Sequence, residues 1–196
     1  MPKKYFNRDG IVGFPTKVKK ILDASYLNPE DAKRKLENLG YKYDKELSTP
    51  ESKVFLDRKG RPNIAFRGSK RIFDDFLGSD LKLALGLENY DKRFQEAKHL
   101  TKLVQDKYDQ PANVFGSSLG GSLAEKSGAN GKVVTHNKGV GLFDIGKDIP
   151  KNQVDYRNRN DIVSLLSLTQ SHNHNNLKEK ETGKNPLDIL GNHSIV

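Results

Sequence analysis

The segment that most constrains this chain lies at residues 113–128 and reads NVFGSSLGGSLAEKSG. A short apolar run ends in glycines and two adjacent serines, and a helix-compatible stretch follows. Gly116 and Gly120 stand two residues before and after Ser118, which leaves room for a tight turn between a strand and a helix. Such a turn requires a strand that leads directly into a helix, and it can hold one reactive serine above the strand end.

Two other interpretations of this segment have to be weighed. It could be a flexible loop rich in glycine and serine, because G-x-S-x-G alone occurs often by chance. It could also bind phosphate, but the Gly-Lys-Ser/Thr ending that places a lysine on a phosphate is absent. Residues elsewhere in the chain are needed to distinguish a flexible loop from a turn that carries a nucleophile.

Strand patterns and helix patterns alternate along the chain, which predicts an α/β fold with a mostly parallel sheet flanked by helices. Two short apolar runs around Arg58-Lys59-Gly60-Arg61 indicate a β-hairpin over 53–66. The expected helices are 71–86, 91–108 and 118–128, and the further expected strands are 113–115, 132–135 and 153–157.

The N-terminal part of the chain is expected to be a helical extension, residues 1–52, packed on the core of the domain at 53–196. Asn28-Pro29-Glu30-Asp31 is a good helix start, and Gly40 would end that helix. The polar segment 41–52 is expected to be a connection, and the polar segment 169–185 an exposed or mobile loop. The apolar tail from residue 186 should return to the body of the protein.

Composition narrows the possible partners. The chain has 196 residues, no cysteine and a formal net charge of +9, with a pI of about 9.5. Without cysteine there is no disulfide and no thiolate ligand or nucleophile. Positive charge attracts nucleic acid, anionic lipid surfaces and acidic partners. Basic residues are interspersed with acidic ones along the whole chain, so we expect no stable nucleic-acid partner.

The chain shows no targeting or membrane-spanning segment. No stretch approaches the ~20 apolar residues needed to cross a bilayer, and the first 15 residues lack the apolar core of a signal peptide. We therefore expect a soluble protein that is cytoplasmic or packaged in an assembly.

A serine hydroxyl needs a base, and the base needs an acid that orients it. Downstream of Ser118, Asp161 follows a predicted strand and His193 lies near the end of the chain. The order Ser, Asp, His is that of the α/β hydrolases. Asp155 and Asp144 are the competing acids, and His172 and His174 the competing bases; His136 is expected to pack in the core or at the rim of the site.

On these residues the chain resembles the class 3 lipases, α/β hydrolases that include the fungal triacylglycerol lipases. The resemblance covers about residues 53–196, and the N-terminal part matches nothing in it. The similar segments are NIAFRGSKRIFDDFLGSDL (63–81), VFGSSLGGSLA (114–124), VVTHNKGVG (133–141), VDYRNRNDIVSLL (154–166) and GNHSIV (191–196). The chain departs from the family pattern at Ser117, where His is frequent, at Phe76 in place of Trp, and at Ile162 in place of Pro.

The resemblance implies an α/β-hydrolase-like domain and a role for each matched residue. Ser118 would be the nucleophile, Asp161 the orienting acid and His193 the general base and acid. Ser69 and the Leu119 N–H would form the oxyanion hole. Arg67 is expected to form a structural ion pair near its turn rather than to act on substrate.

The predicted function is therefore hydrolysis of lipid esters through an acyl-enzyme, with transient contact to an anionic membrane surface. No cofactor is expected. His172 and His174 lack a third ligand nearby, so no metal site is expected either. Two alternatives remain: an inactive hydrolase fold that serves as a structural or binding component of a larger particle, and a basic protein associated with nucleic acid.

Overall fold

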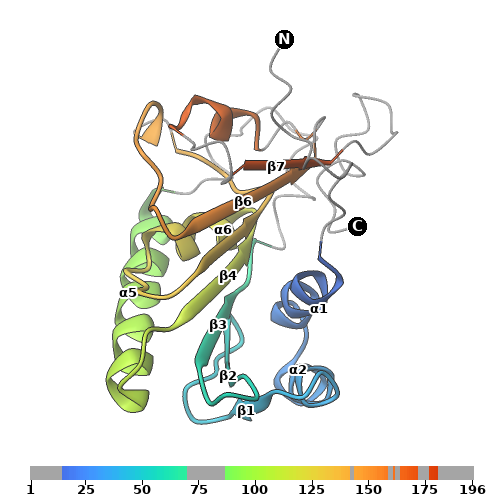
Figure 1. Ribbon diagram of the computed structural model, residues 1–196. Helices are drawn as coiled ribbons and strands as arrows, with labels where there is room; N and C mark the ends of the chain where they lie inside the picture. Colours follow the sequence, from blue (N-terminus) through green and yellow to red (C-terminus); the bar gives the residue numbers. More distant parts are fainter. Residues whose placement is uncertain are drawn as a thin grey trace.

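The computed structural model describes residues 15–69, 87–141, 144–158, 161, 164–171 and 177–180. A sheet crosses this part of the molecule, and its neighbouring strands follow one another in chain order (Figure 1). The seven strands of the described residues are β1 (Lys42–Asp44), β2 (Ser52–Leu56), β3 (Pro62–Phe66), β4 (Asn113–Ser117), β5 (Val133–His136), β6 (Gln153–Asn158) and β7 (Leu177–Lys180).

The sheet is mostly parallel, as the sequence predicts. Strands β3 to β7 pair in parallel, and β1, β2 and β3 form the antiparallel edge. The β2–β3 pair is the hairpin expected over 53–66, with Gly60 at a φ of 78° in its turn. Because parallel strands end at the same edge, the residues that follow β3, β4, β5 and β6 lie near one another.

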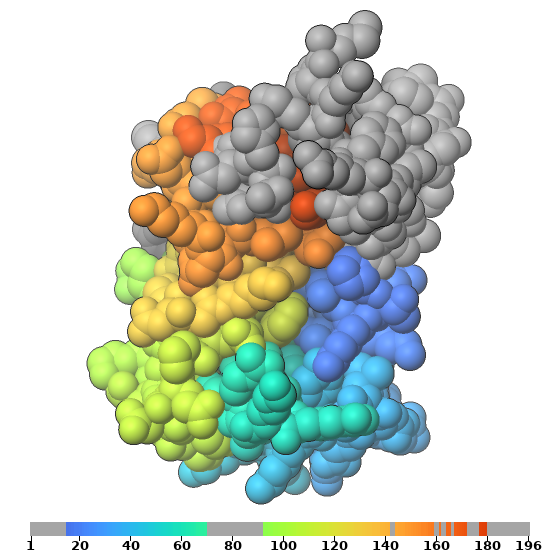
Figure 2. All heavy atoms as spheres, in the orientation of Figure 1, coloured from blue at the N-terminus to red at the C-terminus, as the bar shows by residue number. Residues whose placement is uncertain are grey.

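Helices cover both faces of the sheet. Helices α5 (Leu87–Tyr108) and α6 (Leu119–Lys126) pack on one face, while α1 (Thr16–Ser25) and α2 (Pro29–Glu37) pack on the other (Figure 1). When each parallel strand is added on the same side of the one before it, right-handed connections place all their helices on one face of the sheet. The second face is therefore left to the N-terminal helices, and their atoms form a continuous surface with those of the hairpin (Figure 2).

Alternating side chains of the central strands fill two apolar clusters. Ile64, Val114 and Val133 pack under α5 and α6, whereas Ala65 and Phe115 pack under α1 and α2. Strands buried on both faces are typical of parallel sheets sandwiched between helices.

The division of the chain near residue 52 into an N-terminal extension and a main domain stays a prediction.

The expected N-terminal helix is confirmed in detail. The Asn28 side chain accepts a hydrogen bond from the Asp31 N–H at 3.0 Å, and Pro29 opens α2. Gly40 follows the helix at a φ of 80°, a conformation that glycine adopts without strain.

Two local predictions were wrong. The connection expected over 41–52 contains edge strand β1, and the loop expected over 169–185 contains β7, whose Leu177 is buried. Both segments are polar, and they become strands because a neighbouring strand supplies the hydrogen bonds. The helix expected over 71–86 and the tail from residue 186 lie outside the described residues. No helix in the described part of the chain is long and apolar enough to cross a membrane.

Candidate active site

Ser118 occupies a strained turn between β4 and α6. Its φ is 55° and its ψ is −127°, although it is not a glycine. Residues other than glycine rarely adopt positive φ, and such strain persists only where the surroundings hold it in place. The position of Ser118 at a strand–turn–helix junction is as predicted, and its catalytic role stays a prediction.

Backbone hydrogen bonds hold this turn on both sides. The Ser118 N–H donates to the His136 carbonyl at 3.0 Å, at the end of the neighbouring strand β5. The Ser118 carbonyl accepts from the N–H groups of Gly121 at 2.9 Å and Ser122 at 3.3 Å. It also accepts from the Gly139 N–H at 3.2 Å, which comes from the loop after β5. Contacts from two elements therefore fix the strained residue.

The glycines around Ser118 are required by close packing. A Cβ added to Gly116 would lie 1.9 Å from the Gly120 carbonyl oxygen. A Cβ on Gly120 would lie 2.3 Å from the Phe66 carbonyl oxygen, at the end of β3. These distances leave no space for a side chain, so the segment is a close-packed turn and not an open loop.

The Ser118 hydroxyl is buried and available for chemistry. Ser118 is 2% exposed, and its Oγ has no hydrogen-bond partner in the described part of the protein. The N–H groups of Leu119 and Gly120, in the first turn of α6, likewise lack an acceptor among the described residues. Free N–H groups at a helix start attract negative charge, so they can stabilise an oxyanion formed beside Ser118.

The Arg67-Gly68-Ser69 turn lies against the serine. A Cβ on Gly68 would be 3.4 Å from the Ser118 Cβ, and Ser69 is the next residue. The turn is anchored at Arg67, which binds Glu51 at 2.5 Å and accepts a hydrogen bond from Arg93 at its carbonyl at 2.6 Å. The expected structural ion pair of Arg67 is thus confirmed, and Ser69 follows an anchored segment beside Ser118.

Asp161 lies in the loop after β6 and is 1% exposed. Its Oδ2 accepts a hydrogen bond from the Ser164 N–H at 3.0 Å, and its own N–H donates to the Asn158 carbonyl at 3.0 Å. The Asn158 N–H donates in turn to the Asn137 side chain at 2.7 Å, just beyond β5. This series of hydrogen bonds ties the Asp161 loop to the strand end that holds Ser118.

The competing acid Asp144 is engaged in ion pairs away from this turn. It binds Lys126 and, at 3.2 Å, Lys147. Burial alone would raise the pKa of Asp144, but the hydrogen bond and charge of Lys126 bring it below its ordinary value. Asp144 is therefore a structural carboxylate.

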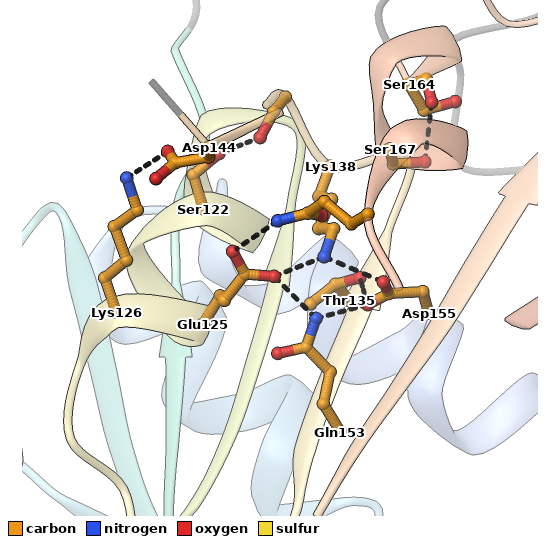
Figure 3. A network of polar contacts seen from close by, with 12 residues as sticks. Ser122, Glu125, Lys126, Thr135, Lys138, Asp144, Gln153, Asp155, Ser164 and Ser167 are labelled. Atoms are coloured by element: carbon orange, nitrogen blue, oxygen red, sulfur yellow. Dashed lines mark hydrogen bonds and ion pairs between the residues drawn. The ribbon is translucent and has the colours of Figure 1, made fainter. Parts of the chain in front are cut away.

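The competing acid Asp155 belongs to a buried network centred on Lys138 (Figure 3). The Lys138 side chain is 1% exposed, and its Nζ lies 2.8 Å from Asp155 and also contacts Glu125 on α6. Gln153 donates to both carboxylates at 2.7 Å, and the Thr135 hydroxyl donates to Asp155 at 2.6 Å. No local sequence pattern reveals this network, because its members come from α6, β5, β6 and the loop between the two strands.

Of the four histidines considered for the site, the described residues include His136. His136 is 2% exposed at the end of β5, so it packs in the core as expected. His193, His172 and His174 lie outside the described residues. Within the described ranges no group of three His, Cys, Asp or Glu side chains could hold a metal ion.

One cavity formed by the described residues does not include Ser118. It has a volume of about 510 Å³ and lies between α5 and the segment that leads into β2. Phe66 and Leu123 line its inner side, but neither Ser118 nor Ser69 does. The cavity is therefore separate from the turn that carries the serine.

The fold is similar to that of a known lipase. No family model matches the sequence, and no curated protein sequence matches it. Among solved structures, the Lip2 lipase from Yarrowia lipolytica is similar, with a TM-score of 0.54 and 15% sequence identity. The alignment covers 90% of this chain and 90% of the lipase. The parallel sheet, the flanking helices and this structural likeness together give the chain an α/β-hydrolase-like fold.

Proposed function

We propose that this chain is a serine hydrolase of carboxylic esters that acts through an acyl-enzyme. The observation that carries the proposal is the conformation of Ser118. A buried hydroxyl is held in a strained turn beside the N–H groups of Leu119 and Gly120, and neither the hydroxyl nor these N–H groups has a partner among the described residues. Strain of about 1–3 kcal/mol has to be offset by the surroundings, and it is concentrated at functional sites.

In the proposed first half-reaction, the Ser118 Oγ attacks the ester carbonyl carbon while His193 accepts the hydroxyl proton. The carbonyl oxygen becomes an oxyanion, stabilised by the Leu119 N–H and by Ser69. Asp161 orients His193. The protonated His193 then donates its proton to the departing alkoxide, so that an alcohol leaves and an acyl-serine remains.

In the second half-reaction, water attacks the acyl-serine while His193 again accepts a proton. The same N–H groups stabilise the second oxyanion. Collapse of this intermediate releases the carboxylic acid and returns the proton to the Ser118 oxygen. The reaction consumes one water for each ester and requires no cofactor.

The proposed substrates are lipid esters, and the support for them is the likeness to lipases rather than any contact in this chain. From the net charge of +9 we further propose that the enzyme works at a membrane surface. An anionic membrane surface attracts a basic protein, which would bring the active site to its substrate.

Labelling with a fluorophosphonate probe tests the proposal, because the probe forms a covalent bond only with an activated serine. We expect wild-type protein and Ser117→Ala to be labelled and Ser118→Ala to remain unlabelled. Ester hydrolysis by Ser118→Ala should fall by up to ~10⁶-fold, the loss seen when a serine hydrolase loses its nucleophile. Labelling that survives Ser118→Ala would exclude this serine as the nucleophile.

The other two members of the triad need matched controls. Asp161→Asn and His193→Ala should each lower kcat by at least ~10³-fold. Asp148→Asn and His99→Ala change the same residue types at exposed positions and should leave kcat unchanged. Equal effects at the test and control positions would contradict the assignment.

The alternatives predict different results. A folded wild-type protein that neither reacts with the probe nor hydrolyses esters would support a structural or binding component of a larger particle. Binding to DNA or RNA in a filter assay, with affinity that falls steeply with salt, would support the nucleic-acid alternative.

A further inference from the structure

The N-terminal helices reach the candidate site through Tyr26, which follows α1 directly. Its N–H donates to the Asp23 carbonyl at 3.2 Å, which continues the helical conformation of α1. Ile21, Leu22 and Ala24 of the same helix are at most 1% exposed and pack against the sheet. The backbone that carries Tyr26 is therefore fixed relative to the strands.

The hydroxyl of Tyr26 lies against the turn that precedes Ser69. A Cβ built on Gly68 would be only 2.4 Å from the Tyr26 hydroxyl oxygen and 2.8 Å from the Ser117 carbonyl oxygen. The same position is 3.4 Å from the Ser118 Cβ. Atoms of Tyr26, Ser117 and Ser118 thus crowd the same side of Gly68.

The Tyr26 hydroxyl keeps its proton at the pH at which esterases are assayed. Burial raises the pKa of Tyr26 above its ordinary value. The Gly68 backbone and the charges of Arg67 and Arg93 oppose this rise without cancelling it. A neutral hydroxyl is therefore the group that fills the space beside Gly68.

A glycine next to an oxyanion-hole residue makes the turn adaptable, because glycine samples backbone conformations that other residues avoid. Arg67 is held by Glu51 and Arg93. The Tyr26 hydroxyl lies against the next residue, Gly68, and limits its movement. Both contacts restrict the peptide that leads to Ser69.

We propose that Tyr26 is a positioning residue for catalysis, which acts by holding the Arg67-Gly68-Ser69 turn in the geometry that stabilises the oxyanion. The inference rests on the proposed ester hydrolysis, since it concerns the oxyanion hole of that reaction. It gives the N-terminal extension a part in the proposed active site.

The test is Tyr26→Phe, which removes one oxygen atom and keeps the ring. Tyr41→Phe is the matched control, because Tyr41 is a 7%-exposed tyrosine packed edge-on against Phe55 in the apolar cluster that contains Ile21 and Leu22 of α1. For each variant we would measure kcat and KM with a short-chain p-nitrophenyl ester, the inhibition constant of a trifluoromethyl ketone, and thermal unfolding.

We expect Tyr26→Phe to lower kcat by about tenfold, less than the ~10²–10³-fold loss caused by removing a direct oxyanion donor. KM should stay within about twofold, because substrate binding in the ground state does not use the oxyanion hole. The ketone forms a hemiketal oxyanion with the serine, so its inhibition constant should rise by about the same factor as kcat falls. Tyr41→Phe should change none of these values.

Other outcomes would overturn the proposal. A wild-type kcat in Tyr26→Phe, an unchanged inhibition constant, or an equal loss of kcat in Tyr41→Phe would each show that the hydroxyl does not position the turn. If wild type hydrolyses esters and Tyr26→Phe equals it, only this inference fails. If wild type itself neither reacts with fluorophosphonate nor hydrolyses esters, the proposed function fails and this inference with it.

Discussion

At the scale of single residues, the strained turn at Ser118 is held by backbone hydrogen bonds and by close packing that requires glycine at 116 and 120. Helix α6 can approach the end of β3 only because Gly120 has no side chain. That approach places the Leu119 N–H, the Gly68 turn and the serine hydroxyl within one small volume. The strained backbone of Ser118 and the close packing around Gly116 and Gly120 therefore occur at the same site.

Gly120→Ala should disrupt this arrangement. The new Cβ would lie 2.3 Å from the Phe66 carbonyl oxygen and 3.0 Å from backbone atoms of Arg67 and Gly68, none of which can move cheaply. We expect the free energy of unfolding to fall by about 3 kcal/mol or more, as measured by urea denaturation, and fluorophosphonate labelling to fall by at least ~10²-fold.

Gly139→Ala is the control for this prediction. A Cβ at Gly139 would meet only the Ser122 hydroxyl, at 3.6 Å, which is an ordinary contact distance. Its N–H, which donates to the Ser118 carbonyl, is unchanged by the substitution. Stability and labelling near wild-type values are expected here, and equal damage at both positions would contradict the packing argument.

At the scale of elements, the Lys138 network joins three parts of the fold (Figure 3). It connects α6 through Glu125, strand β6 through Asp155, and the loop after β5 through Lys138 itself. The next residue of that loop, Gly139, holds the Ser118 carbonyl and accepts a hydrogen bond from the Ser122 hydroxyl. The network thus secures the elements on which the strained turn depends.

Lys138→Met should lower the free energy of unfolding by about 3–5 kcal/mol, because two carboxylates would stay buried without their cation. Lys102→Met is the control: Lys102 pairs with Asp106 on the exposed side of α5, and its side chain is 75% exposed. That change should cost at most about 0.5 kcal/mol. Chemical denaturation of both variants tests the difference, and a Lys138→Met variant as stable as Lys102→Met would contradict it.

Sequence patterns predicted the elements whose capping residues, turn residues and apolar spacing all indicate the same structure. The start of α2 follows from Asn28-Pro29, and the hairpin follows from two apolar runs around a turn. Strands β1 and β7 escaped prediction because their sequences, KYD and LKEK, are short and polar. They are strands because β2 and β6 offer hydrogen-bond partners, which no local pattern reveals.

At the scale of the whole molecule, the sheet needs cover on both faces, and the N-terminal helices supply it on the face that α5 and α6 leave open. This arrangement also brings basic residues of α1 next to the hairpin turn. Lys17, Lys20 and Arg58 are exposed and line one surface groove together with Thr16 and Leu39. The groove concentrates part of the net charge of +9 in one place.

We expect activity on vesicles that contain anionic lipid to fall as salt increases, because salt screens the attraction between exposed charges. Changing Lys17 and Lys20 together to Gln should weaken vesicle binding at low salt by roughly fivefold per charge removed. Hydrolysis of a dissolved short-chain ester should not respond to either change. Activity on anionic vesicles that is independent of salt would count against a role for charge.

The sequence by itself determined the alternation of strands and helices and the place of Ser118 between two glycines. Both appear as local patterns, the spacing of apolar residues and the spacing of glycines around a serine, so they can be read without the fold. Only the tertiary structure placed the Tyr26 hydroxyl against Gly68 and buried Lys138 between Glu125 and Asp155. Those residues are distant along the chain, and it is the packing of helices on both faces of one sheet that brings them together.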